Sequence, residues 1–169
     1  MSKVLTRAIL LGGLLAGVFV LSALAEEFLF RSTIIGSNPN TVIGAVPSGG
    51  APWTVHRGAA ALTGDGRLRV EIAGLILVNL GTPGPVKSVS ASLVCGGTGG
   101  SVVATTDAVP LSPEGDAEVE SRVNMPSACF GPVVLIRAAF NDTPGPWIAG
   151  TGFTNASEPN SEGHNEAAA

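Results

Sequence analysis

Few side chains in this sequence have the chemistry that catalysis or metal binding requires. The only histidine before the C-terminal tail is His56, and neither Cys95 nor Cys129 belongs to a C-x-x-C pair or has a histidine nearby in the sequence. Structural zinc sites need four such ligands at short, regular spacings. We therefore expect neither a metal ion nor another cofactor, and a protein that is not an enzyme.

A glycine-rich segment, CGGTGG at 95–100, allows two interpretations, a phosphate-binding loop or a turn between strands. A Walker-type loop needs a lysine after its glycines, and a dinucleotide-binding loop has to open a helix. Here the glycines contain no lysine and are followed by SVVATT, which is rich in β-branched residues. The sequence therefore predicts that residues 96–100 form the tip of a hairpin.

Three side chains are candidates for contact with a ligand. Trp53 and Trp147, which each follow a proline, could stack on a sugar ring or fill the core of a small β-domain. His56, in the segment WTVHRG, is either a surface residue or a binding residue. Together with the acidic segment EGDAEVE at 114–120, it also gives a third hypothesis, a hydrolase or metalloenzyme.

The first 25 residues have the layout of a secretory signal peptide. Lys3 and Arg7 precede an apolar run over 8–21, and Ala-Leu-Ala at 23–25 forms a small-x-small cleavage motif. Cleavage there would release a chain that begins at Glu26. The alternative is a retained membrane anchor, because the apolar stretch over 8–25 has 18 residues, close to the shortest length that spans a bilayer. We expect a secreted, extracellular or cell-envelope protein that no longer contacts the membrane after cleavage.

The charge balance of the mature chain limits its partners. Removal of Lys3 and Arg7 leaves seven of the nine basic residues against 13 acidic ones, so the net charge becomes −6. Nucleic acids and anionic membrane surfaces are bound through basic patches. The composition therefore argues against both kinds of partner and leaves an unknown protein or surface partner.

Cys95 and Cys129 are expected to form a disulfide, because an even number of cysteines in an exported chain favours oxidation. Cys95 ends the segment VKSVSASLVC, in which Val89, Ala91 and Leu93 alternate with serines and face a core. The bond would join this strand to the connection that leads into the apolar segment PVVLIRAAF. Closing the loop would stabilise the fold by about 3–4 kcal/mol.

The rest of the sequence predicts short strands and almost no helix. In RLRVEI, charged and apolar residues alternate after the turn signal Asp65-Gly66, which is a strong hairpin pattern. The two TPGP segments, at 82–85 and 143–146, are interpreted as loops between strands. Further strands are predicted over 86–95, 101–112, 116–123, 132–140 and 147–153. The prediction is an antiparallel β-sandwich of immunoglobulin-like or Greek-key type over 41–153, after an N-terminal segment at 26–40 and before a disordered tail at 154–169.

Two resemblances extend this interpretation. The chain from PWTVHRG at 52–58 to WIAGTG at 147–152 resembles a group of small exported bacterial β-sandwich proteins with no assigned activity. The segments GAAALTGDGRLRVEIAGL and VKSVSASLVCGG are similar to the opening of chordin-like (CHRD) domains, a β-sandwich class related in plan to copper/zinc superoxide dismutase. That class usually carries His-x-His in the strand after the hairpin, whereas SVSASLV has no histidine here. The resemblance therefore implies a sandwich without a metal site.

These observations together predict an exported, non-catalytic structural or interaction module of the cell surface or envelope. The alternative is a domain that binds a small ligand or carbohydrate through Trp53 and Trp147.

Overall fold

The structure is a computed structural model that describes residues 27–152. The predicted signal peptide at 1–25 and the predicted tail at 154–169 lie outside the described residues. Within the described range the regular elements are strands and one short 3₁₀ turn, η1 (Gly97–Gly99), which confirms the all-β prediction. No helix in this range has the length and apolar character to cross a bilayer. The strands are β1 (Phe28–Gly36), β2 (Val42–Ile43), β3 (Val46–Pro47), β4 (Trp53–Thr54), β5 (Arg57–Thr63), β6 (Arg67–Ala73), β7 (Ile76–Leu77), β8 (Ser88–Cys95), β9 (Ser101–Thr105), β10 (Val109–Pro110), β11 (Ala117–Arg122), β12 (Val133–Phe140) and β13 (Thr143–Thr151).

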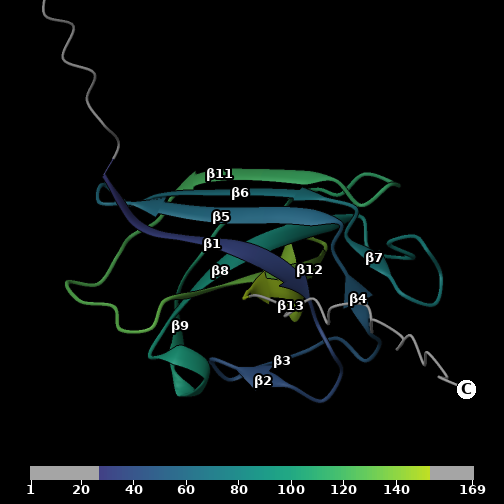
Figure 1. Ribbon diagram of the computed structural model, residues 1–169, viewed down its shortest axis with the longest axis horizontal. Coiled ribbons are helices and arrows are strands. Elements are labelled where there is room, and N and C mark those ends of the chain that lie inside the picture. The colour runs from purple at the N-terminus through teal and green to yellow at the C-terminus, as the bar shows by residue number, and fades with distance from the viewer. Residues whose placement is uncertain (1–26, 153–169) are drawn as a thin grey trace, which may run out of the picture.

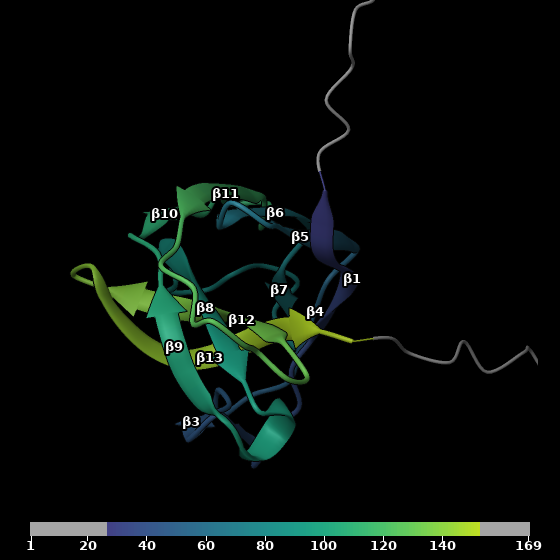
Figure 2. The same ribbon diagram turned by 90° about the vertical axis from the view of Figure 1, so that its left-hand side faces the viewer.

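Nine strands form one antiparallel sheet that curls into two layers (Figure 1). The strand order is β10-β8-β12-β13-β1-β5-β6-β11, with β9 paired to β8. We call β5, β6, β11 and residues 28–33 of β1 the upper layer, and we call β8, β9, β10, β12, β13 and residues 34–36 of β1 the lower layer. Figure 2 shows the two layers facing each other, with β1 along one side. The layers are therefore parts of one hydrogen-bonded sheet, joined through β1.

Strand β1 pairs with both layers. Thr33 lies opposite Ala59 of β5, whereas the next residue, Ile34, lies opposite Thr151 of β13. The domain therefore begins earlier than the predicted residue 41, and the predicted N-terminal segment at 26–40 contains a central strand. A register shift near Phe28 and the polar run RST at 31–33 hide the period of two in this strand.

The hairpin of β5 and β6 forms where the sequence predicts it. The Thr63 hydroxyl donates a hydrogen bond to the Asp65 carboxylate across the turn. Gly66 has a φ of 84°, a conformation that side chains with a Cβ seldom adopt. Beyond the turn, Leu68 and Val70 are fully buried against the lower layer, so the alternation in β6 sets which of its side chains face water.

The lower layer is largely buried on both faces of its central strands, β8 and β12. Its inner face belongs to the main core, and its outer face carries a second small core that is covered by the segment around β3. Ser90 and Ser92, which the alternation in β8 places in water, are both 0 % exposed. The second core consists of Val46, Val94, Leu135 and Trp147, with Ile43, Val102 and Val133 at its margin.

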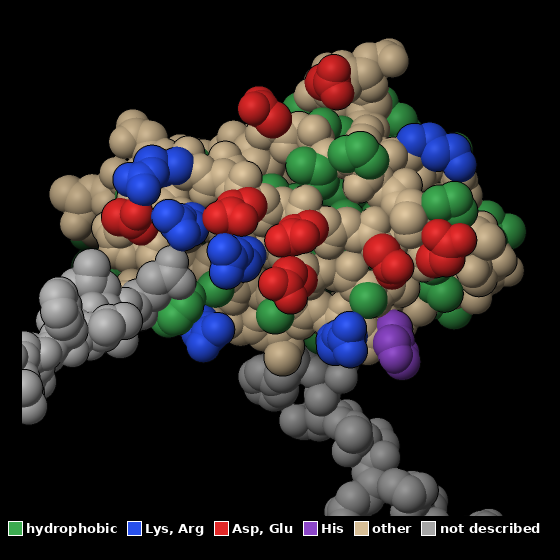
Figure 3. Space-filling model, turned by 90° about the horizontal axis from the view of Figure 1, so that it is seen from above, with side chains coloured by type: hydrophobic (Ala, Val, Ile, Leu, Met, Phe, Trp, Pro, Cys, Tyr) green, Lys and Arg blue, Asp and Glu red, His purple; other side chains and the backbone are tan. Residues whose placement is uncertain are grey.

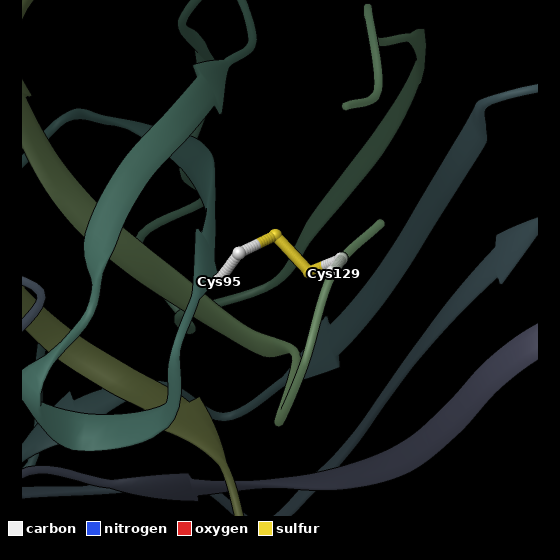
Figure 4. Close-up of a disulfide and its surroundings, with 2 residues drawn as sticks. All are labelled: Cys95 and Cys129. Carbon is white, nitrogen blue, oxygen red and sulfur yellow. A yellow bond between two sulfur atoms is a disulfide. The ribbon is translucent and has the colours of Figure 1, made fainter. Parts of the chain in front are cut away.

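The predicted disulfide joins Cys95 at the end of β8 to Cys129 in the connection between β11 and β12 (Figure 4). The two Cα atoms are 5.0 Å apart, within the range that a disulfide spans. Beside the bond, residues 96–100 turn the chain from β8 into β9, as the sequence predicts. Two further hydrogen bonds, from the amides of Gly96 and Gly97 to the carbonyls of Phe130 and Gly131, hold the same connection against this turn.

Candidate functional site

The structure does not bring the two predicted ligand-binding tryptophans together. Trp53 is 7 % exposed and belongs to the main core, whereas Trp147 is 6 % exposed and belongs to the second core on the opposite face of the lower layer. Stacking on a sugar requires an accessible ring face. Both indoles are instead packed by protein, which is the core-filling alternative of the sequence analysis.

His56 is exposed on the connection between β4 and β5. Its backbone amide donates to the carbonyls of Ala73 and Gly74, and its side chain forms no hydrogen bond within residues 27–152. In the same range, no three His, Cys, Asp or Glu side chains gather where a metal ion would bind. The structure therefore places His56 where β5 begins and β6 ends, with no catalytic or metal-binding side chain grouped with it among the described residues.

A hollow of about 440 Å³, which we call the alanine groove, lies on the outer face of the upper layer. Ala59 and Ala61 of β5 form its floor, because the alternating residues Ala60 and Leu62 are turned into the core. The neighbouring strands carry long side chains on this face, so the short side chains of β5 leave a trough between them. Figure 3 shows basic and acidic side chains gathered over this face of the molecule.

Cross-strand pairing sets which side chains face each other over the floor. Arg31 of β1 and Arg69 of β6 are both paired with Ala61, and Thr33 and Glu71 are both paired with Ala59. Paired residues on neighbouring strands stand about 5 Å apart. One end of the groove is therefore flanked by two arginines from opposite walls, and the other end by a threonine and a glutamate.

The arginine end carries more positive than negative charge. Arg67 and Arg69 lie within 4.0 and 3.3 Å of the same carboxylate, that of Glu120, and these side chains are 41–48 % exposed. Exposed ion pairs of this kind contribute about 0–1 kcal/mol to stability. The guanidinium of Arg31 lies 4.1 Å from the centre of the Phe28 ring, and no carboxylate among residues 27–152 pairs with it. Arg31 is thus free to bind an anion.

Arg69 supplies a second free donor. Its Nη2 atom is within hydrogen-bond distance of Glu120, its Nε atom has no hydrogen-bond partner among the described residues, and the side chain is 43 % exposed and lines the groove. A planar guanidinium also matches the two oxygens of a carboxylate. The arrangement at Ala61 can therefore bind an anionic group from both walls.

Comparison with known proteins adds no relative. Neither protein-family models, nor curated proteins, nor solved structures give a match to this chain. The resemblances to small exported bacterial proteins and to chordin-like domains therefore stay predictions.

Sequence reasoning missed the alanine groove. The alternation of Arg67, Arg69 and Glu71 shows that these side chains face water, but it does not show that a second wall stands opposite them. That wall is β1, which lies in the segment predicted to precede the domain. One sequence feature could have indicated the groove. The outward residues Ala59 and Ala61 of β5 have short side chains, and the next strand in the sequence carries arginines on its outward face.

Proposed function

We propose that this chain is an exported, non-catalytic binding module that holds an organic anion in the alanine groove. The observation that carries the proposal is the position of Arg31 and Arg69 on opposite walls above Ala61. Small-molecule sites are concave, largely apolar and supplied with a few polar groups that orient the ligand. The groove has these properties, with alanine and phenylalanine surface between its charged groups.

The lining of the groove favours binding over covalent chemistry. Among the residues that line it, the polar ones are arginines, a glutamate, a serine and threonines, with neither histidine nor cysteine. General-base activation of a hydroxyl requires a base within hydrogen-bond distance. The hydroxyls of Ser32 and Thr33 donate to backbone carbonyls, which are not bases. The Thr63 hydroxyl donates to the Asp65 carboxylate, whose pKa is lowered by this hydrogen bond, so that it is a weak base. We therefore place recognition, and not catalysis, at this surface.

Export is part of the proposal. The signal-like leader at 1–25 supports it, and so does the disulfide, because such bonds persist in oxidising compartments. Mass spectrometry of material from the culture medium or the cell envelope should give a chain that starts at Glu26. An intact Met1 in the membrane fraction would show that the leader is retained as an anchor.

Binding can be tested by NMR titration of the mature chain with three probes of equal length, hexanoate, hexanesulfonate and hexylamine. We expect the two anions, and not the amine, to shift the amide signals of Ala61 and Arg69. Arg31→Ala should weaken anion binding about tenfold, because a hydrogen bond to a charged group contributes about 1.5–3 kcal/mol.

Arg122→Ala is the matched control for charge. Arg122 lies on the same face, pairs with Asp65 at 2.7 Å, and stands outside the alanine groove. If Arg122→Ala weakened binding as much as Arg31→Ala does, only long-range attraction would be involved. That result, or signal shifts confined to other parts of the chain, would contradict the proposal.

A further inference from the structure

We infer that the ligand of the alanine groove is zwitterionic, with a carboxylate at the arginine end and a cationic amine at the end where Glu71 lies. This inference rests on the proposed function and specifies its ligand. The two ends are set by consecutive outward rows of the sheet, the row of Ala61 and the row of Ala59. Outward residues two positions apart on a strand are separated by about 7 Å. A matching ligand carries its two charges at about that distance.

The carboxylate at the acidic end of the groove faces a second carboxylate that lies just outside the groove. Glu71 of β6 is directly paired with Glu118 of β11, and both side chains are exposed on the outer face. Like charges at directly opposite positions of an antiparallel pair are destabilising. Neither carboxylate forms a hydrogen bond or an ion pair within residues 27–152. An ammonium group between them would relieve this repulsion.

The surface beyond the Ala59 row continues the acidic character. A second, more open hollow shares Ala59 and Glu71 with the alanine groove and is also lined by Asp116 and Glu118. Its one cationic side chain is Arg57, which forms no ion pair with these carboxylates. The face therefore changes from mainly basic at the Ala61 row to mainly acidic beyond the Ala59 row. A ligand with two negative ends would be repelled at the second row.

Three further probes test this polarity against hexanoate in the same NMR titration, with hexylamine again as the cationic control. They are 6-aminohexanoate, whose charges lie at opposite ends of five methylene groups; adipate, with a carboxylate at each end; and glycine, whose charges are adjacent. We expect 6-aminohexanoate to bind about threefold to fivefold more tightly than hexanoate, the range given by one exposed ion pair. Adipate should bind more weakly than hexanoate, and glycine should produce no shift in the groove.

Glu71→Gln keeps the size of the side chain and removes its charge. This substitution should remove most of the preference for 6-aminohexanoate and should strengthen adipate binding, while hexanoate binding changes less. Glu114→Gln removes the same charge from an exposed turn outside the alanine groove and serves as the control. A circular-dichroism melt of each variant separates these effects from loss of folding.

The outcomes distinguish the two proposals. If hexanoate binds at Ala61 but adipate binds equally well, or Glu71→Gln leaves the order of the probes unchanged, the zwitterion inference is wrong and the anion groove remains. If no carboxylate probe shifts the groove signals, both proposals are wrong.

Discussion

The outer faces of the two layers start from similar sequence patterns and end in different environments. Strand β6 reads RLRVEIA and β8 reads SVSASLVC, each with polar residues at alternate positions. In β6 the polar set is exposed or half-buried, whereas Ser90 and Ser92 of β8 are fully buried. The difference arises from what covers each face. The segment around β3 and the side chain of Trp147 pack over the lower layer, and no described segment packs over the alanine groove.

Alternation of polar and apolar residues along a strand therefore shows that the strand has two different faces, but it does not show that the polar face is exposed to solvent. A covered face gains stability from packing and loses access to solvent. An open face keeps its charged side chains available to a ligand. If this contrast is correct, substitutions on the lower outer face should change the free energy of unfolding, and substitutions in the alanine groove should change binding.

The largest effect is expected for Trp147→Ala on the covered face. Truncation of a buried tryptophan leaves a cavity and should lower the free energy of unfolding by about 3–5 kcal/mol. Urea denaturation monitored by circular dichroism measures the loss. Arg69→Ala on the open face is the counterpart and should cost less than about 0.5 kcal/mol. A loss below about 1 kcal/mol for Trp147→Ala would mean that the second core is not a packed core.

The next largest effect is expected from reduction of the Cys95–Cys129 disulfide. Release of the closed loop should lower stability by about 3 kcal/mol and lower the melting temperature clearly. Binding to the alanine groove should survive at temperatures where the reduced protein is folded, because neither cysteine lines it. The measurement is a thermal melt with and without reductant, together with a hexanoate titration. Two free thiols in the native protein, before any reductant is added, would contradict the assigned bond.

Arg137→Met should give an intermediate loss. On the lower outer face, Nε and Nη2 of Arg137 donate to the carbonyls of Gly145 and Pro144 at 2.7 and 2.8 Å, and burial lowers the pKa of this guanidinium. Methionine would fill the space and leave the two carbonyls without these donors, which should cost about 2 kcal/mol. Arg122→Met on the exposed upper face, which changes the same atoms, should cost less than about 0.5 kcal/mol in the same urea experiment. Equal losses for the two variants would show that coverage does not distinguish these faces.

Ala61→Leu should separate stability from binding most sharply. The leucine side chain would occupy the floor between Arg31 and Arg69, so hexanoate binding should be lost. Stability should change by less than about 0.5 kcal/mol, because the position lies on the open face. Ser101→Leu on exposed β9 controls for the added hydrophobic surface and should leave binding intact. Unchanged binding in Ala61→Leu would place the ligand elsewhere.

The smallest effect concerns acid. The hydrogen bond from Thr63, followed by the weaker influence of the Arg67 backbone and nearby arginines, holds the pKa of Asp65 below its ordinary value. Because the folded-state pKa is lowered, this carboxylate stabilises the hairpin above about pH 4, the ordinary range for Asp, and the contribution is lost as the pH falls through the folded-state pKa. Asp65→Asn should flatten the acid limb of a plot of melting temperature against pH. An acid limb identical to that of the parent chain would contradict this role.

How far the sequence predicts the fold is clearest in the two TPGP segments. The sequence predicts both to be loops; residues 82–85 do lie between β7 and β8, but the prediction is wrong for residues 143–146, which begin β13. A proline has no backbone N–H to donate to a neighbouring strand. Here the side chain of Arg137 on β12 donates hydrogen bonds to the backbone carbonyls of Pro144 and Gly145. Four identical residues thus adopt different structures because only the second copy pairs with a neighbouring strand, β12, which carries Arg137. The four residues themselves do not contain that information.

Features that depend on local sequence can be predicted, whereas the alanine groove cannot. The Asp65-Gly66 hairpin, the glycine tip and the disulfide depend on residues close in sequence or on the only available pairing, and all three were predicted. The alanine groove depends on β1 and β6 standing on either side of β5, which is a tertiary arrangement. The sequence shows which charged side chains β1 and β6 carry, but it does not show that these two strands lie on either side of β5.

The position of β1 between β5 and β13 also has a consequence for the order in which the chain assembles. A chain that emerges from the ribosome or through a membrane N-terminus first presents β1 early and β13 last, and Thr33 reaches its partner Gly152 across 119 residues. Contacts over such separations form slowly, and an unpaired strand edge invites association with other chains. The upper layer can form by adding strands to the β5–β6 hairpin, but the edge of β1 that pairs with β13 stays unpaired until β13 has been synthesised or exported. The time between those two events is the interval in which this protein most needs protection from aggregation.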